Sequence, residues 1–176
     1  MVLTCLMLQV TVKFFVIFDF QFAKVLNLRP TRRSLHQQIL EGGRNDLYKI
    51  RSIRHGTGVA CRQDLHLGDF VCTYPGDLLN ASEWQMRKLL PTTDKEFVFE
   101  FKWKEQYWYI DGSEKNGLGN YLNHSRMNKN VRVKLEVVNG VPYLYFAVVK
   151  NVVEAGTELV YEYDKKEKSL AWMANS

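Results

Sequence analysis

The stretch GLGNYLNHS, residues 117–125, is the part of this 176-residue chain that is hardest to explain as hydrophobic packing. Two glycines, two asparagines and a histidine stand around only two aliphatic side chains, Leu118 and Leu122. Such a segment can bury little apolar surface of its own. We therefore expect other parts of the fold to hold it in place.

Two distant stretches are also rich in residues that commonly contact ligands, namely glycines in one and tyrosines in the other. The sequence HGTG, residues 55–58, leads into a predicted strand and leaves a bare backbone that a ligand can approach closely. The sequence ELVYEY, residues 158–163, alternates like a strand and places Tyr161 and Tyr163 on one face. Each stretch alone is typical of a turn, a structural histidine or half-buried packing, so only their combination indicates a function.

Read in order, four segments carry a resemblance to a known family. HGTG is followed by TYPGDLL at residues 73–79, by Asn-His-Ser at 123–125 and by AGTELVYEY at 155–163. This series resembles the motifs of the SET-domain protein-lysine methyltransferases over about residues 31–176. The resemblance implies a mainly β fold with short helices, in which small sheets surround a pseudoknot formed by the Asn-His segment and the tyrosine strand.

The resemblance also assigns roles to single residues. It implies that Tyr163 supplies the catalytic hydroxyl, and that Tyr74 and Tyr161 line a lysine channel, with Tyr161 near the position that limits the number of methyl groups. The cofactor is then S-adenosylmethionine, bound by His55, Gly56, Thr57, Phe97, Asn123 and His124, with Trp172 closing over its adenine. The resemblance implies no metal.

Methyl transfer from a sulfonium to an amine is a direct in-line displacement. The protein has to align the reactants, exclude water and supply the amine uncharged. Tyrosine rings can pack on the lysine methylenes, and desolvation in such a channel lowers the pKa of the lysine ammonium. No covalent nucleophile is needed, which agrees with a sequence that has no Cys-His pair at a recognisable spacing.

Four features resemble the histone H4 lysine-20 monomethyltransferase group in particular. They are the basic helix RRSLHQQILEGG, the phrase GDFVCTYPGDLL, the hairpin NGVPYLYFAV and a zinc-free tail that carries a tryptophan. The resemblance therefore implies monomethylation of a histone H4 tail on nucleosomes. It places the protein in the nucleus on chromatin.

Three positions depart from the family pattern. Phe97 stands where a cofactor-contacting tyrosine is usual, Asn120 replaces an arginine or lysine, and Asp164 replaces a glycine. The alternative hypothesis is thus a SET-fold chromatin-binding module with weakened catalysis. A nucleotide-phosphate loop is disfavoured, because HGTG lacks the Lys-Ser/Thr pair and precedes a strand rather than a helix.

Composition and charge fit this interpretation. The chain is 46% hydrophobic and 24% charged, as expected for one globular domain, and its three cysteines form no Cys-x-x-Cys pair, which favours a reducing compartment. Residues 1–63 hold ten Lys/Arg and three Asp/Glu, whereas the remainder holds fourteen and sixteen. The basic part could contact DNA and the acidic part a basic histone tail, or the charges could simply solvate the surface.

The chain divides into four predicted parts. Residues 1–28 form an apolar segment of unknown role, interrupted by Lys13 and Asp19 and therefore not expected to span a membrane. A secretory signal is a minority interpretation of this segment, because no basic region precedes its apolar run. Residues 29–46 form a basic helix, 47–164 the SET domain, and 165–176 the tail that closes the site. We expect a monomer.

The predicted elements inside the domain follow from periodicity and turn signals. A helix begins at Asn80, whose side chain forms a capping box with Glu83, and extends to Leu90. Hairpins are predicted for residues 97–111, turning at Lys104-Glu105, and for 131–149, turning at Asn139-Gly140, since both turn positions of the second need positive φ. Further strands are predicted at 47–53, 59–61, 70–74 and 158–163.

Overall fold

The computed structural model describes residues 33–52, 56–114 and 117–162. The chain divides into two compact units, residues 1–33 and 34–176, and the elements described below belong to the second. The predictions for residues 1–28, His55, Tyr163, Asp164 and Trp172 lie outside the described residues.

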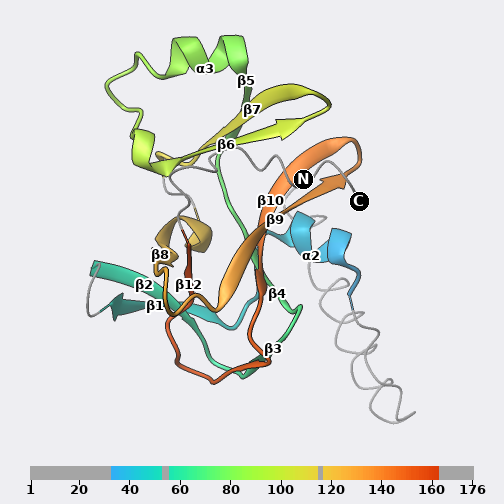
Figure 1. Ribbon diagram of the computed structural model, residues 1–176, viewed down its shortest axis with the longest axis vertical. Helices are drawn as coiled ribbons and strands as arrows, with labels where there is room; N and C mark the ends of the chain where they lie inside the picture. The colour runs from blue at the N-terminus through green and yellow to red at the C-terminus, as the bar shows by residue number, and fades with distance from the viewer. Residues whose placement is uncertain (1–32, 53–55, 115–116, 163–176) are drawn as a thin grey trace, which may run out of the picture. The chain divides into compact units, whose positions relative to one another are not determined.

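The described residues of the domain form five small sheets, which confirms the prediction of a mainly β fold (Figure 1). Two sheets have three strands: β4 (Phe70–Thr73), β10 (Val141–Val148) and β9 (Val131–Val138) in one, and β5 (Asp77–Asn80), β7 (Gln106–Asp111) and β6 (Val98–Trp103) in the other. The strand pairs are β1 (Leu47–Ser52) with β2 (Gly56–Cys61), β3 (Leu65–His66) with β11 (Val152–Val153), and β8 (Asn123–His124) with β12 (Val160–Tyr161). The helical elements are α2 (Leu35–Glu41), α3 (Ala81–Arg87), η1 (Lys95–Phe97) and η2 (Leu118–Tyr121).

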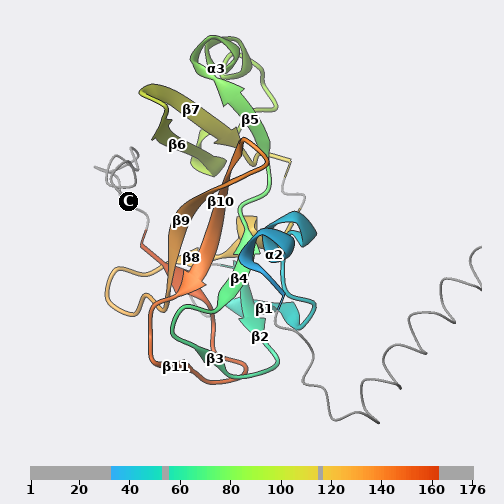
Figure 2. The ribbon, with the colours of Figure 1, turned by 90° about the vertical axis from the view of Figure 1, so that its right-hand side faces the viewer.

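The first described helix, α2, is defined by its two caps. Ser34 and Gln37 form a capping box at its start, and Gly42 adopts the left-handed conformation at its end with φ of 83°. Ile39 is fully buried in a small cluster with Phe70 and Tyr145, which packs α2 against the sheet of β4, β10 and β9 (Figure 2). Gly42 thus ends the helix at Glu41, inside the range of residues 29–46 predicted for the basic helix.

Helix α3 follows β5 directly. The predicted capping box of Asn80 and Glu83 is present, with both side chains bonded to backbone N–H groups. The helix ends at Arg87, earlier than the predicted Leu90, and none of its residues is buried. The ring of Trp84 instead stacks on Tyr109 of β7, with centroids 5.3 Å apart.

Both predicted hairpins form. Asn139 and Gly140 have φ of 52° and 80°, as a two-residue turn between twisted strands requires. Lys104 and Glu105 have φ of 48° and 58° between β6 and β7. The N-terminal boundary of the first hairpin differs from the prediction, because Phe97 ends η1 and the strand begins at Val98.

One continuous core joins the sheets. Its largest fully buried side chains include Phe101 of β6, Phe146 of β10 and Leu122, which follows η2. Leu122 therefore anchors the stretch GLGNYLNHS from within. Among the described residues, no helix is long and apolar enough to cross a membrane.

Candidate active site

The stretch at 117–125 is held by its neighbours, as predicted. Gly119 lies so close to the carbonyl oxygen of Thr73 and the ring of Pro75 that a Cβ atom at this position would overlap both. Asn120 is 6% exposed, and its amide nitrogen donates to the carbonyl oxygens of Pro75 and Gly112, each at 3.3 Å. A turn of η2 is thereby fixed against the segment that carries Tyr74.

Asn123 ties three elements together. Its side-chain nitrogen donates to the carbonyl oxygen of Thr57 at 3.1 Å and to Oε1 of Glu158 at 2.7 Å. The other carboxylate oxygen of Glu158 accepts from the hydroxyl of Ser52 at 3.0 Å. Both amide hydrogens of Asn123 are therefore used inside the protein, so its side chain can contact a cofactor only through Oδ1.

The two described glycines of HGTG differ in their surroundings. A Cβ atom at Gly58 would lie 2.5 Å from Glu158 and 3.2 Å from the amide of Asn123, so this glycine makes room for the Glu158 side chain. Gly56, with φ of 76°, has nothing within 4 Å of the corresponding point. The space beside the backbone is thus open at Gly56 among the described residues, whereas at Gly58 the protein itself fills it.

The Asn-His segment and the tyrosine strand are paired in parallel. Val160 of β12 faces Asn123 of β8, and Tyr161 faces His124. Asn130 extends this pairing: its side chain donates to the carbonyl of Glu158 at 2.8 Å and accepts from the N–H of Val160 at 2.8 Å. Two stretches more than thirty residues apart are thereby brought side by side.

Two phenylalanine rings join Tyr74 and Tyr161, the two described tyrosines of the predicted lysine channel. Tyr74 and Tyr161 are 6% exposed each. The ring of Phe99 contacts the ring of Tyr74 edge-on, with the centroids 4.5 Å apart, and stacks on the ring of Tyr161, with the centroids 6.1 Å apart. Phe146 contacts both tyrosines, at 6.4 and 4.9 Å. The two tyrosines therefore belong to one apolar cluster, as walls of a lysine channel would.

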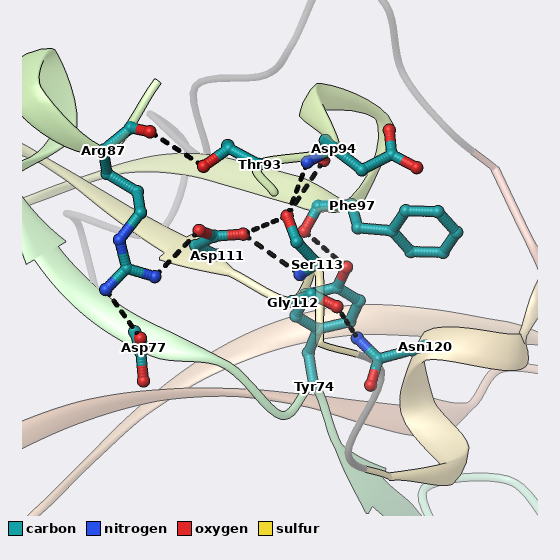
Figure 3. A network of polar contacts seen from close by, with 10 residues as sticks. All are labelled: Tyr74, Asp77, Arg87, Thr93, Asp94, Phe97, Asp111, Gly112, Ser113 and Asn120. Carbon is teal, nitrogen blue, oxygen red and sulfur yellow. Dashed lines mark hydrogen bonds and ion pairs between the residues drawn. The ribbon is translucent and has the colours of Figure 1, made fainter. Parts of the chain in front are cut away.

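The hydroxyl of Tyr74 is fixed by backbone groups (Figure 3). It donates to the carbonyl oxygen of Phe97 at 2.8 Å, and the same oxygen accepts from the N–H of Gly112 at 2.9 Å. Because the phenol donates its own hydrogen to this carbonyl oxygen, the orientation of the hydroxyl is set by the main chain. Phe97 contributes through its main chain here, a role that its side-chain identity does not alter.

Sequence reasoning missed the importance of Glu158 and Phe99. Glu158 stands in the quoted tyrosine motif without a role, and a carboxylate at the first position of the predicted strand 158–163 was the available signal. Phe99 lies within the predicted hairpin of residues 97–111, and nothing in the sequence separates it from its neighbours. Only the fold shows that it lies between two tyrosines.

A cavity of about 310 Å³ lies elsewhere, beside the end of α2. It is lined by Glu41, Gly42, Gly43, Arg44, Leu47, Cys72, Thr73, Pro75, Gly117 and Leu118, none of which is a predicted site residue. Burial raises the pKa of the Cys72 thiol to about 12, so it stays protonated and unreactive at neutral pH. Within residues 33–52, 56–114 and 117–162, no group of three acidic, cysteine or histidine side chains could hold a metal.

The structure thus brings together most of the predicted site that it describes. Thr57, Asn123 and Glu158 share hydrogen bonds, and His124 pairs with Tyr161. Tyr74 joins Tyr161 through the aromatic cluster.

Three comparisons with known proteins bear on this arrangement. Residues 56–164 match the model of the SET domain family. The chain is 29% identical to N-lysine methyltransferase KMT5A of Xenopus tropicalis over 147 residues, which cover 78% of this chain and 43% of that protein. It is 32% identical to histone-lysine N-methyltransferase Set8 of Drosophila melanogaster over 150 residues, which cover 81% of this chain and 21% of that protein.

A solved structure is also similar. CpSET8 from Cryptosporidium superposes with a TM-score of 0.57 and 27% sequence identity, over 67% of this chain and 57% of that one. The likeness confirms the predicted fold. The chain spans less than half the length of these two curated relatives.

Proposed function

Because this chain belongs to the SET-domain family, we propose that it is a protein-lysine N-methyltransferase that uses S-adenosylmethionine and acts on a histone tail. The observation that carries the proposal is the junction of β8 and β12, where the Asn123–His124 segment meets the strand of Tyr161. This junction adjoins the aromatic cluster that contains Tyr74. It supports a site in which cofactor groups and channel groups are neighbours.

The residues present fit this cofactor. Gly56 offers an open backbone, and the side-chain oxygen of Asn123 and the main chain of 123–124 can bind polar groups of an amino acid and an adenine. When bound, S-adenosylmethionine supplies an electrophilic methyl group. The chain's own task is to hold the lysine amine in line and dry, and the buried rings around Tyr161 suit that task.

The finer proposal is monomethylation of histone H4 lysine-20 on nucleosomes. Its support is the similarity to relatives named KMT5A and Set8. The protein should transfer label from labelled S-adenosylmethionine to histone H4 in nucleosomes, and mass spectrometry should place one methyl group on lysine-20. Nucleosomes with H4 lysine-20 replaced by arginine are the matched control. Equal labelling of both samples would refute the assigned lysine, and no label on any histone would refute the histone substrate.

Tyr161 is expected to limit the number of methyl groups. Its buried ring is wedged against Phe99 and Phe146, so a hydroxyl on it occupies channel space that phenylalanine would leave open. Replacing it by phenylalanine should keep the fold and produce dimethylated H4 where the wild type gives monomethylated H4. Mass spectrometry of the reacted histone measures this ratio. An unchanged ratio of dimethylated to monomethylated H4 at equal turnover would show that Tyr161 does not limit the number of methyl groups.

A catalytically weakened binding module is the second candidate, favoured by Phe97 in place of a tyrosine. This substitution weighs less against the enzyme, since Phe97 accepts the hydrogen bond of Tyr74 through its main-chain carbonyl oxygen, which any residue at this position would supply. Isothermal titration calorimetry separates the two candidates. Binding of S-adenosylmethionine supports the enzyme, whereas nucleosome binding without any cofactor affinity supports the module.

A further inference from the structure

Gly112 lies between the hydroxyl of Tyr74, which belongs to the proposed lysine channel, and the side chain of Asn120, which belongs to the stretch that carries Asn123. A Cβ atom at Gly112 would lie 2.7 Å from the hydroxyl oxygen of Tyr74 and 2.9 Å from its ring, and would overlap the amide nitrogen of Asn120 (Figure 3). Gly112 itself is buried. No positive φ explains the glycine, because Gly112 is not among the glycines with φ in that range. The requirement is therefore one of space beside Tyr74.

The backbone of Gly112 is held from both sides. Its N–H donates to the carbonyl oxygen of Phe97, and its own carbonyl oxygen accepts from Asn120. The preceding residue, Asp111, ends the pairing of β7, and its carboxylate accepts from Nη1 of Arg87 at 3.1 Å and from the N–H of Ser113 at 3.0 Å. The Asp111 side chain is 2% exposed, so water competes little for its hydrogen bonds to Arg87 and Ser113.

Asn120 connects this corner to the cofactor segment. Its amide nitrogen reaches Gly112 and also Pro75, the residue after Tyr74, while its Oδ1 accepts from the N–H of Gly117 at 3.4 Å. Asn120 lies three residues before Asn123 in the same stretch. One side chain thus fixes two backbone segments, the residue after Tyr74 and Gly112 beside its hydroxyl, to the turn that leads into Asn123.

We propose that Asn120 is a positioning residue that acts through Gly112 to fix the Tyr74 hydroxyl, and that it thereby restricts the number of methyl groups transferred. The inference rests on the proposed function, because it takes Tyr74 to be part of the lysine channel. An amide suits this place, since two carbonyl oxygens and one N–H need one donor group and one acceptor in a buried space.

Two variants test whether Asn120 and Gly112 position the Tyr74 hydroxyl, one by adding a methyl group and the other by removing an amide. Gly112→Ala introduces the overlapping methyl group, and Asn120→Ala removes both carbonyl contacts. Each is expected to raise the share of dimethylated product at least threefold over the wild type, and to lower kcat more than it raises KM for S-adenosylmethionine. Asn80→Ala is the control: it removes the cap of α3, which lowers the melting temperature, and it touches neither Tyr74 nor Gly112. Asn80→Ala should keep the wild-type product ratio.

A second measurement is independent of activity. The protein is labelled with 3-fluorotyrosine, and the Tyr74 fluorine signal is assigned with Tyr74→Phe. Gly112→Ala and Asn120→Ala should shift this signal, whereas Asn80→Ala should leave it in place. An unmoved signal in both variants would overturn the proposal, as would a moved signal with an unchanged product ratio in an active protein. A wild type that transfers no methyl group while the signal moves would refute the proposed function and leave the positioning contact intact.

Discussion

Replacing Tyr163 by phenylalanine is expected to lower kcat for histone methylation by on the order of 100-fold or more, the scale on which a positioned hydroxyl contributes to proton handling. Tyr163 lies outside the described residues, and its role is inferred from the resemblance and from its place two residues after Tyr161. The change removes one oxygen atom, so the melting temperature should stay within a few degrees of the wild type. Turnover is measured with labelled S-adenosylmethionine under saturating nucleosomes.

Tyr145→Phe is the matched control for this result. Tyr145 is a buried tyrosine that packs on Phe70 beneath α2, outside the proposed site. Its variant should keep wild-type turnover. If the two variants lose activity equally, the loss reflects a general sensitivity of the protein to the removal of a tyrosine hydroxyl. If Tyr163→Phe keeps full activity, Tyr163 is not the catalytic hydroxyl.

Replacing Glu158 by alanine is expected to weaken S-adenosylmethionine binding by about tenfold or more and to destabilise the domain. The change removes the charged acceptor that the Asn123 amide and the buried Ser52 hydroxyl share, and a hydrogen bond to a charged group contributes about 1.5–3 kcal/mol. It also leaves an empty space beside Gly58. Calorimetry with S-adenosylmethionine and thermal unfolding measure the two effects.

Two further variants sharpen this test. Glu158→Gln should fall between alanine and wild type, because its oxygen can still accept from Asn123 while the Ser52 hydroxyl turns to accept from the new amide. Glu154→Ala removes an exposed carboxylate directly after β11 and should change neither the cofactor affinity nor the stability. A cofactor affinity that is the same in Glu158→Ala and Glu154→Ala would show that Asn123 needs no fixed orientation.

Local rules carried the prediction of single elements. Asn80 with Glu83, Gly42 and the Asn139-Gly140 pair each specify a cap or turn through their own backbone chemistry, so the sequence was sufficient there. The ordered motifs were sufficient for the family and for the pairing of residues 123–124 with 160–161. The ends of helices and strands were harder to predict. Helix α3 ends at Arg87 rather than at the predicted Leu90, because the helix propensity of the sequence continues beyond the last residue that is helical in the fold.

Contacts between distant segments could not be read from the sequence. The carboxylate of Glu158 reaches Ser52 across more than one hundred residues, and Gly58 is small because of that carboxylate rather than because of a ligand. Asn120 looked like the loss of a charge until its two carbonyl partners were in view. Each of these facts depends on packing between elements, which no local pattern encodes.

The pairing of β12 with β8 has a consequence for biosynthesis. Leu159 donates to Val59, and Val160 lies beside Asn123, so the proposed site closes only through contacts between residues far apart along the chain. High contact order of this kind slows folding, because the loop entropy is lost before the contacts form. A ribosome-bound chain that has not yet released residues 158–161 could build the β9–β10 hairpin but could not acquire cofactor affinity. Competence should therefore arise only after residues 158–161 have left the ribosome.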